Sequence, residues 1–229
     1  MAPRPENDSH ESHEAKVSEA ARAYAAALLA GDEVAAEIAI REAMDAHLSS
    51  EVIDDEIIAP ALWLVGELWE RGEITVADEH IATEISIRVL ALQREAQRVA
   101  QARRDHRVML AAAPGERHVV ALRMAANLLR DAGYGVVMLG ADVPAHALGA
   151  AARRLEPDVI CLTLTMHHGA DELLGAIAAV QQEWPSARFI VGGRGLTVRI
   201  QPQSMLGICG RVSEVVEAVD AMVKQAGFN

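Results

Sequence analysis

The sequence is poor in aromatic residues, cysteine and basic charge. Aromatic side chains make up 3% of its 229 residues, and 21 Lys and Arg face 33 Asp and Glu, which gives a formal net charge of −12. Because nucleic-acid surfaces need clustered Lys and Arg, direct binding to nucleic acid is not expected. A short basic cluster, Arg103, Arg104 and Arg107, falls where we expect a linker.

The two cysteines, Cys161 and Cys209, lie in apolar segments. We expect buried thiols in a reducing compartment, and neither a disulfide framework nor a covalently attached chromophore. No apolar run is long enough to cross a bilayer, and the polar, acidic start is unlike a signal peptide. The sequence therefore predicts a soluble cytoplasmic protein that does not contact membranes.

The first part of the chain carries helical signals. Residues 1–16 are too polar to bury a core and predict a disordered tail. Residues 17–104 predict an antiparallel four-helix bundle, because their helical segments are joined by short connections. The predicted helices are about 17–30, 33–47, 50–70 and 76–103, with Asp32, Ser49 or Ser50, and Thr75 as N-terminal caps. Pro60 lies inside the third helix and should kink or interrupt it.

Residues 105–229 alternate between apolar strands and amphipathic helices. The predicted strands are 108–112, 136–139, 159–164, 189–191 and 207–209. The predicted helices are about 118–132, 145–154, 170–183 and 212–226. This alternation is typical of an α/β domain, and five strands suit a flavodoxin-like (Rossmann-type) parallel sheet with helices on both faces.

A histidine follows the first predicted strand of this domain. Gly115, Glu116, Arg117 and His118 form a polar turn at the carboxyl edge of the sheet, where ligands of open α/β sheets collect. Glu116 could hold one imidazole nitrogen of His118 so that the other binds a metal. Taken alone, however, the turn favours a water-exposed histidine at a helix start.

Four motifs in register resemble those of cobalamin (vitamin B12)-binding domains. The family's acid-x-His element is similar to Glu116-Arg117-His118, and its loop after strand two is similar to residues 140–144. Thr163-Leu164-Thr165 stands in place of a Ser-x-Leu or Ser-x-Thr element, and Gly192-Gly193 in place of the family's Gly-Gly. The family's glycine three residues after the histidine is Ala121 here, whose methyl group could crowd the cofactor.

The resemblance implies a cobalamin site. His118 would replace the cofactor's own benzimidazole as lower ligand of cobalt, with Glu116 orienting the imidazole ring. The displaced nucleotide tail would enter a slot in the sheet. The residues expected to contact the cofactor in this domain are Glu116, His118, Asp142, Val143, Thr163, Thr165, Gly192 and Gly193.

The helical segment resembles the light-sensing cobalamin proteins of the CarH type. Trp69, nine further residues and then Glu79-His80 match the signature of that group. The resemblance implies that these three residues surround the adenosyl group of adenosylcobalamin above the corrin ring. The alternative is a core tryptophan near a helix end, with Glu79 and His80 on a polar helix face.

These resemblances imply a cobalamin-dependent light sensor, not an enzyme, that acts as a homo-oligomer (a dimer or tetramer). CarH-type relatives carry an N-terminal DNA-binding domain, for which this chain has only its acidic tail, so output through a protein partner is expected. One alternative is a corrinoid methyl carrier for methyltransferases, and a blander one is a cobalamin store or chaperone. A further variant binds a bilin noncovalently near His167, His168, Arg194 and Arg199.

Overall fold

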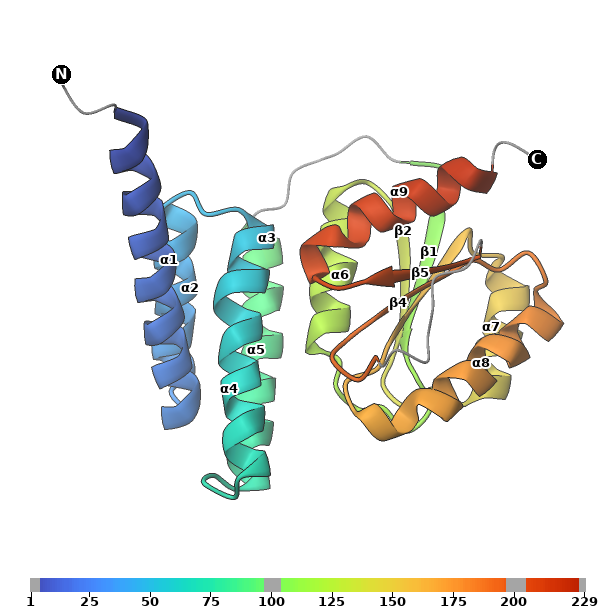
Figure 1. Ribbon diagram of the computed structural model, residues 1–229, viewed down its shortest axis with the longest axis horizontal. Helices are drawn as coiled ribbons and strands as arrows, with labels where there is room; N and C mark the ends of the chain where they lie inside the picture. Colours follow the sequence, from blue (N-terminus) through green and yellow to red (C-terminus); the bar gives the residue numbers. More distant parts are fainter. Residues whose placement is uncertain (1–4, 97–103, 197–204, 227–229) are drawn as a thin grey trace. The chain divides into compact units, whose positions relative to one another are not determined.

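The computed structural model describes residues 5–96, 104–196 and 205–226. The chain divides into two compact units, Met1–Arg98 and Val99–Asn229, whereas the sequence placed the boundary between residues 104 and 105. Helices α1 to α5 form the helical unit, and strands β1 to β5 with helices α6 to α9 form the α/β unit (Figure 1).

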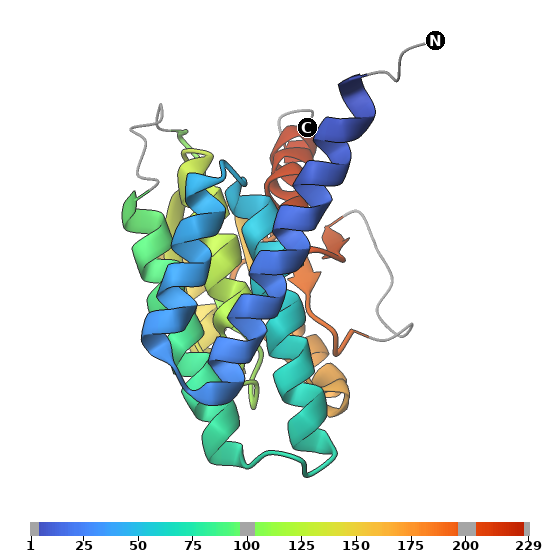
Figure 2. The ribbon, with the colours of Figure 1, turned by 90° about the vertical axis from the view of Figure 1, so that its left-hand side faces the viewer.

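In the helical unit, four long helical stretches pack side by side (Figures 1 and 2). Its elements are α1 (Pro5–Ala30), α2 (Glu33–Asp45), α3 (Ser50–Val52), the π-helix η1 (Ile53–Ile58), α4 (Ala59–Glu70) and α5 (Val76–Ala96). The predicted caps are present: the Asp32 carboxylate accepts the Ala35 N–H at 2.9 Å, and Ser49 Oγ accepts the Val52 N–H at 3.4 Å. Each satisfies a backbone donor that the helix start leaves unpaired.

The predicted start of the first helix differs from the structure. Helix α1 begins at Pro5, so residues 5–16 are helical where the sequence predicted a disordered tail. A helix already nucleated by its buried part extends at low cost, because each added residue gains one hydrogen bond and several residues here are good helix formers. The predicted end of the last helix, at residue 103, lies outside the described residues.

Pro60 is accommodated by a π-helical turn in place of a break. Proline lacks an N–H, and its ring collides with the carbonyl group four residues earlier, which here belongs to Glu56. The turn just before Pro60 is η1, in which the Ala59 N–H donates to the Asp54 carbonyl five residues earlier. The wider turn shifts the carbonyls that would meet the ring, and the helix continues as α4.

A buried hydrogen-bonded pair joins α1 to α5 inside the helical unit. The Tyr24 hydroxyl donates to Ser86 Oγ at 2.9 Å, and Ser86 Oγ donates to the Ala82 carbonyl at 2.8 Å. Both side chains are fully buried. Burial raises the pKa of Tyr24 to about 12, and its hydrogen bond to Ser86 offsets only part of that rise. The phenol is therefore neutral and can donate this bond.

The α/β unit is a five-stranded, fully parallel sheet in the order β2-β1-β3-β4-β5, which is the predicted flavodoxin-like order (Figure 1). The strands are β1 (Arg107–Ala112), β2 (Gly135–Gly140), β3 (Val159–Thr163), β4 (Phe189–Gly192) and β5 (Leu206–Cys209). The helices are α6 (Val120–Asp131), α7 (Ala145–Leu155), α8 (Ala170–Glu183) and α9 (Val215–Ala226), with 3₁₀ turns η2 (His167–Gly169) and η3 (Val212–Glu214).

Each face of the sheet has its own apolar core. Leu148, Leu173 and Val180 from α7 and α8 pack against one face, and Leu122, Leu129 and Val219 from α6 and α9 against the other. Both cysteines are buried, as predicted. The chain leaves the sheet in opposite directions from β1 toward β2 and from β3 toward β4, so a crevice is expected at their carboxyl ends. None of the described helices is long and apolar enough to cross a membrane.

We predict that Tyr24→Phe lowers the free energy of unfolding by about 1 kcal/mol, because it removes one buried hydrogen bond and keeps the ring. Tyr24→Ala should cost about 3–5 kcal/mol, because it also leaves a cavity. Urea unfolding followed by far-ultraviolet circular dichroism measures both. Equal losses for the two variants would contradict this account.

Candidate functional site

The Glu116 carboxylate is the centre of the predicted site. It lies in the turn that follows β1 and is 2% exposed, whereas the neighbouring His118 side chain is 43% exposed. A buried carboxylate must be compensated by hydrogen bonds or by a positive charge, because desolvation penalises the ionised form. Its partners therefore define the local structure.

Four contacts surround this carboxylate. Glu116 Oε1 accepts the His118 backbone N–H at 2.8 Å and lies 2.5 Å from His118 Nδ1. Glu116 Oε2 accepts the backbone N–H groups of Thr165 at 2.5 Å and Met166 at 3.2 Å. One side chain thus connects the turn after β1 with the turn after β3 and orients the imidazole ring, as the sequence predicted for His118.

The balance of these effects keeps Glu116 ionised. Burial raises the pKa of its carboxyl, but the hydrogen bonds from His118 and from the Thr165 backbone outweigh it and lower the pKa from 4.5 to about 2. At neutral pH the carboxylate is therefore an acceptor for the His118 Nδ1–H. A histidine held in this way coordinates a metal through Nε2, and the carboxylate makes the ring a stronger donor.

Asp142 holds the same turn from the β2 side. Its Oδ1 accepts the Gly115 N–H at 2.7 Å, and its own N–H donates to the Glu116 carbonyl at 2.8 Å. The backbone of Asp142 is left-handed, with φ of +48°, which a short polar residue tolerates. The sequence predicted Asp142 as a cofactor contact, and the structure adds this positioning role. Val143, the next residue, is half-buried against the core on the α7–α8 face.

The Gly-Gly pair at the end of β4 lets the backbone lie close to the turn after β3. Gly193 has φ of +110°, and a Cβ atom there would lie 2.3 Å from the Leu164 carbonyl oxygen. Gly192 is less restricted, since its Cβ would meet the Cys209 carbonyl oxygen at 3.4 Å. Gly195 was not predicted from the sequence. A Cβ atom at this position would lie 2.8 Å from the Thr165 carbonyl carbon. The spacing Gly-Gly-x-Gly could have revealed it.

Thr163, at the end of β3, faces this glycine edge. It pairs in register with Gly192, and its Oγ1 is buried with no hydrogen-bond partner in the described part of the chain. An unsatisfied buried hydroxyl costs about 1–3 kcal/mol, which a polar ligand atom could recover. A ring-oriented histidine, an unsatisfied hydroxyl and a glycine-lined edge at one end of the sheet fit a metal-bearing cofactor with a polar tail. This is the donor set predicted for cobalamin.

The predicted residues of the helical unit lie at one end of the α4–α5 hairpin. Trp69 is in the last turn of α4 and 37% exposed, which argues against the alternative of a core tryptophan. Glu79 Oε2 lies 2.5 Å from His80 Nδ1, and Glu79 Oε1 accepts the Thr83 hydroxyl at 2.9 Å. The His80 side chain is 71% exposed. The structure thus joins Glu79 to His80 and places Trp69 across the connecting turn.

Other predicted positions lie near the sheet edge without forming a cluster. His167 and His168 are exposed in η2, directly after Met166, and Arg194 is exposed after Gly193. Arg199 lies outside the described residues. Ala121 is exposed in the first turn of α6. Among the described residues, no group of three or more His, Cys, Asp and Glu side chains could hold a metal ion.

Sequence comparison finds two matches to families described as B12 binding domains, over residues 106–228 and 20–92. The HTH-type transcriptional repressor CarH of Myxococcus xanthus is 33% identical over 170 residues, which are 68% of this chain and 56% of that protein. CarA from the same organism is 30% identical over 146 residues, or 63% of this chain and 50% of that protein. The chain spans about half the length of these curated relatives.

Structure comparison finds the monomethylamine corrinoid protein of Methanosarcina barkeri. It matches with a TM-score of 0.68 and 17% sequence identity, covering 86% of this chain and 96% of that chain. At this identity the likeness concerns the fold: a helical region followed by a five-stranded parallel sheet with helices on both faces.

We predict that Glu116→Gln lowers the free energy of unfolding by about 1–3 kcal/mol, because the amide NH₂ group would face backbone N–H donors. Urea unfolding at neutral pH measures the loss. Glu172→Gln, on the exposed face of α8, is the matched control and should change stability by less than about 0.5 kcal/mol. An equal change in the free energy of unfolding for the two variants would contradict the central role of Glu116.

Proposed function

Because the chain belongs to the B12-binding domain family, we propose that it is a cobalamin-dependent light sensor with no catalytic turnover of its own. The observation that carries this proposal is a repeated arrangement: in both units a carboxylate binds Nδ1 of an exposed histidine, Glu116 with His118 and Glu79 with His80. In each pair the second imidazole nitrogen is the one suited to bind cobalt.

On the sheet side, His118 would be the lower ligand of the corrin cobalt. Glu116 would fix the ring and raise its donor strength while itself held by the Thr165 and Met166 backbone. The Thr163 hydroxyl would bind the nucleotide tail, and the close packing of the Gly193 and Gly195 backbone against the β3 turn would shape the slot. Asp142 and Val143 would border the ring.

On the helical side, Trp69, Glu79 and His80 would cover the upper ligand. When bound, adenosylcobalamin supplies a cobalt–carbon bond that light can break. The exposed indole of Trp69 would shield the adenosyl group, and the Glu79-bound His80 would be oriented for coordination once that group has left. Loss of these contacts would favour a different packing or assembly of the protein, a ligand-dependent shift between two states.

The output proposed here is protein–protein rather than protein–DNA. The similar proteins CarH and CarA are named as HTH-type transcriptional repressors, but this chain carries a net charge of −12, which opposes a nucleic-acid surface. We propose a cytoplasmic homo-oligomer, dimer or tetramer, that signals through a partner protein in response to light.

A corrinoid methyl carrier is the main alternative. The fold is shared with the monomethylamine corrinoid protein, and the lower-ligand turn would serve either role. A methyl carrier must open the upper face of the ring to partner enzymes, whereas a sensor needs a cover there. The Trp69, Glu79 and His80 set, together with the similarity to CarH, favours the sensor.

A sensor that also holds a bilin is a variant of the same proposal. His167, His168 and Arg194 are exposed near the sheet edge and could bind its pyrroles or propionates. Both cysteines are buried, so attachment would be noncovalent. A red absorption band after incubation with biliverdin would support this variant, and no such band would remove it.

We predict that the protein reconstituted with adenosylcobalamin in the dark changes its absorption spectrum irreversibly under green light, because the upper ligand is lost. His118→Ala should alter the dark spectrum, since it removes the lower ligand. An unchanged spectrum under light, combined with methyl transfer to a methyltransferase, would establish the carrier instead. A dark spectrum indifferent to His118→Ala would exclude His118 as the ligand.

We further predict that Trp69→Ala weakens binding of adenosylcobalamin more than binding of hydroxocobalamin, because only the former has an adenosyl group for the indole to cover. Titrations followed by absorption would give both affinities. Trp63→Ala is the matched control, because Trp63 is also on α4 and is 47% exposed. Equal weakening for the two cobalamins would contradict the proposed cover.

A further inference from the structure

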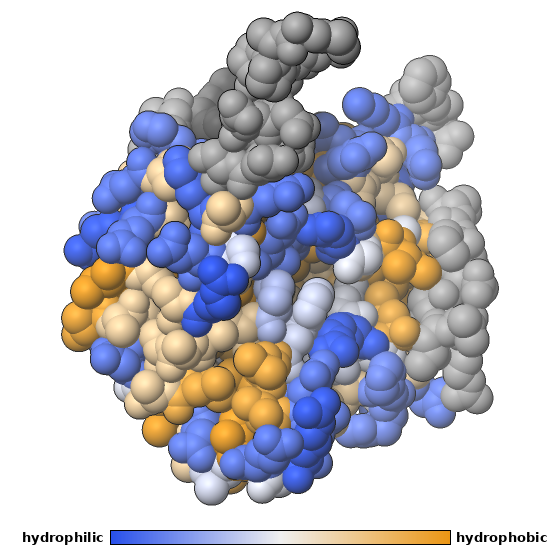
Figure 3. Space-filling model, turned by 60° about the vertical axis from the view of Figure 1, so that its left-hand side comes forward, coloured by the Kyte–Doolittle hydropathy of each residue, from blue (hydrophilic) through white to orange (hydrophobic). Residues whose placement is uncertain are grey.

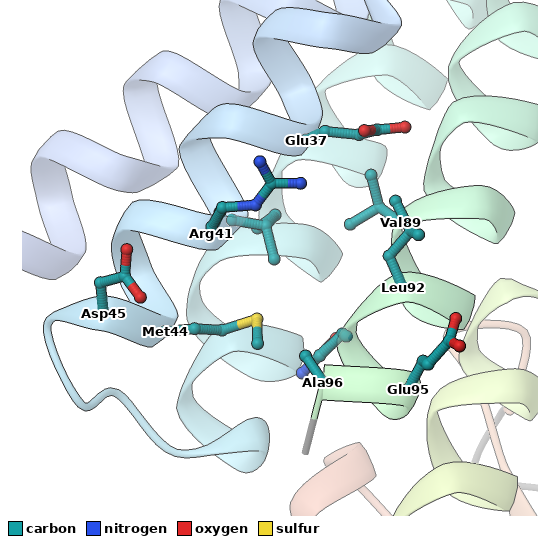
Figure 4. A pocket seen from close by; sticks show the side chains of 10 residues that line it. Glu37, Arg41, Met44, Asp45, Val89, Leu92, Glu95 and Ala96 are labelled. Carbon is teal, nitrogen blue, oxygen red and sulfur yellow. The ribbon is translucent and has the colours of Figure 1, made fainter. Parts of the chain in front are cut away.

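A groove runs between α2 and α5 within the helical unit, apart from the hairpin end that carries Trp69 (Figure 4). Its volume is about 380 Å³. Met44 and Arg41 project from α2, and Val89 and Leu92 lie opposite on α5 (Figure 4). It is lined by Glu37, Ile40, Arg41, Met44, Asp45, Val89, Leu92, Gln93, Glu95 and Ala96. We call it the α2–α5 groove.

One buried polar residue lines the groove. Gln93 is 4% exposed, and its Oε1 is buried without a hydrogen-bond partner among the residues that the structure describes. This oxygen is closed off from solvent, so a molecule docked in the groove would not reach it. Met44, Val89 and Leu92 supply apolar lining, and the flexible Met44 side chain can adapt to different shapes.

Exposed apolar side chains extend this surface along α2. Val34 is 66% exposed and Ile38 47% exposed, and together with Arg41 they follow the spacing of one helix face. Leu92 on α5 is 36% exposed. Figure 3 shows hydrophobic patches between hydrophilic residues on one face of the molecule. A surface of two helices with an apolar centre is the form that receives an amphipathic helix.

The charge of the groove favours a basic helix as its partner. Three carboxylates line it, those of Glu37, Asp45 and Glu95, against the single guanidinium of Arg41. Arg88, beside the groove, is bound by Glu33 at 2.8 Å and Glu37 at 2.6 Å. A second copy of this chain brings a net charge of −12, and an anionic membrane is negative as well, so both are disfavoured.

We propose that the α2–α5 groove is a docking site for a basic amphipathic helix of a partner protein. The apolar face of that helix would cover Met44, Val89 and Leu92, and its Lys or Arg side chains would meet Asp45 and Glu95. The residues that line the groove are not among those proposed to bind cobalamin, so this proposal can be tested independently of light sensing.

The test uses the full chain and two synthetic helical peptides with the same leucine stripe, one carrying lysines and the other glutamates elsewhere. Fluorescence anisotropy at low salt should show binding of the lysine peptide and not of the glutamate peptide. The double variant Asp45→Lys/Glu95→Lys should bind the lysine peptide roughly tenfold or more weakly and gain affinity for the glutamate peptide.

The matched control is Glu172→Lys/Glu217→Lys, which makes the same change in net charge on exposed positions of the α/β unit and should leave binding unchanged. Circular dichroism verifies that every variant folds. No binding of the lysine peptide, or equal loss in both double variants, would overturn the proposal. Sedimentation velocity tests self-association: a homo-oligomer that Asp45→Lys/Glu95→Lys dissociates would assign the groove to a second copy and overturn it as well.

Discussion

A single buried carboxylate organises the candidate site. Glu116 has almost no access to water, so its charge persists only because the backbone of two turns and one imidazole ring converge on it. The turn after β1, the turn after β3 and the orientation of His118 therefore depend on one another. Asp142 extends the same network to β2 through the Gly115 N–H. The turns after β1, β2 and β3 thus meet at the carboxyl edge of the sheet through hydrogen bonds rather than apolar packing.

The glycines at the end of β4 allow close backbone packing at this edge of the sheet. At Gly193 any side chain would overlap the Leu164 carbonyl, so the loop can lie against the β3 turn only because the side chain is absent. The same region leaves the Thr163 hydroxyl without a partner. Close backbone packing and an unsatisfied polar atom thus lie at the same edge of the sheet as an oriented histidine, and this combination fits the cobalamin binding that the family match supports.

The helical unit contains a second carboxylate–histidine pair, Glu79 and His80, which is more exposed. Glu79 binds His80 as Glu116 binds His118, but the Glu79 pair lies at a helix start in contact with solvent. Its ring can therefore reorient at lower cost than His118, whose carboxylate partner is buried. The π-helical turn before Pro60 lets the helix continue into α4, and the buried Tyr24–Ser86 pair joins α1 to α5.

The sequence by itself determined the helix caps at Asp32 and Ser49 and the contact of Glu116 with His118, because these follow from short local motifs. It also predicted the flavodoxin-like strand order, because alternating strands and helices are typical of that fold. Only the tertiary structure decided which donors Glu116 binds beyond its own turn. Thr165 and Met166 are 49 and 50 residues away along the chain, and no local pattern encodes such a contact. The tight fit of Gly193 against Leu164, and the α2–α5 groove with the buried oxygen of Gln93, likewise arise only when distant segments pack together.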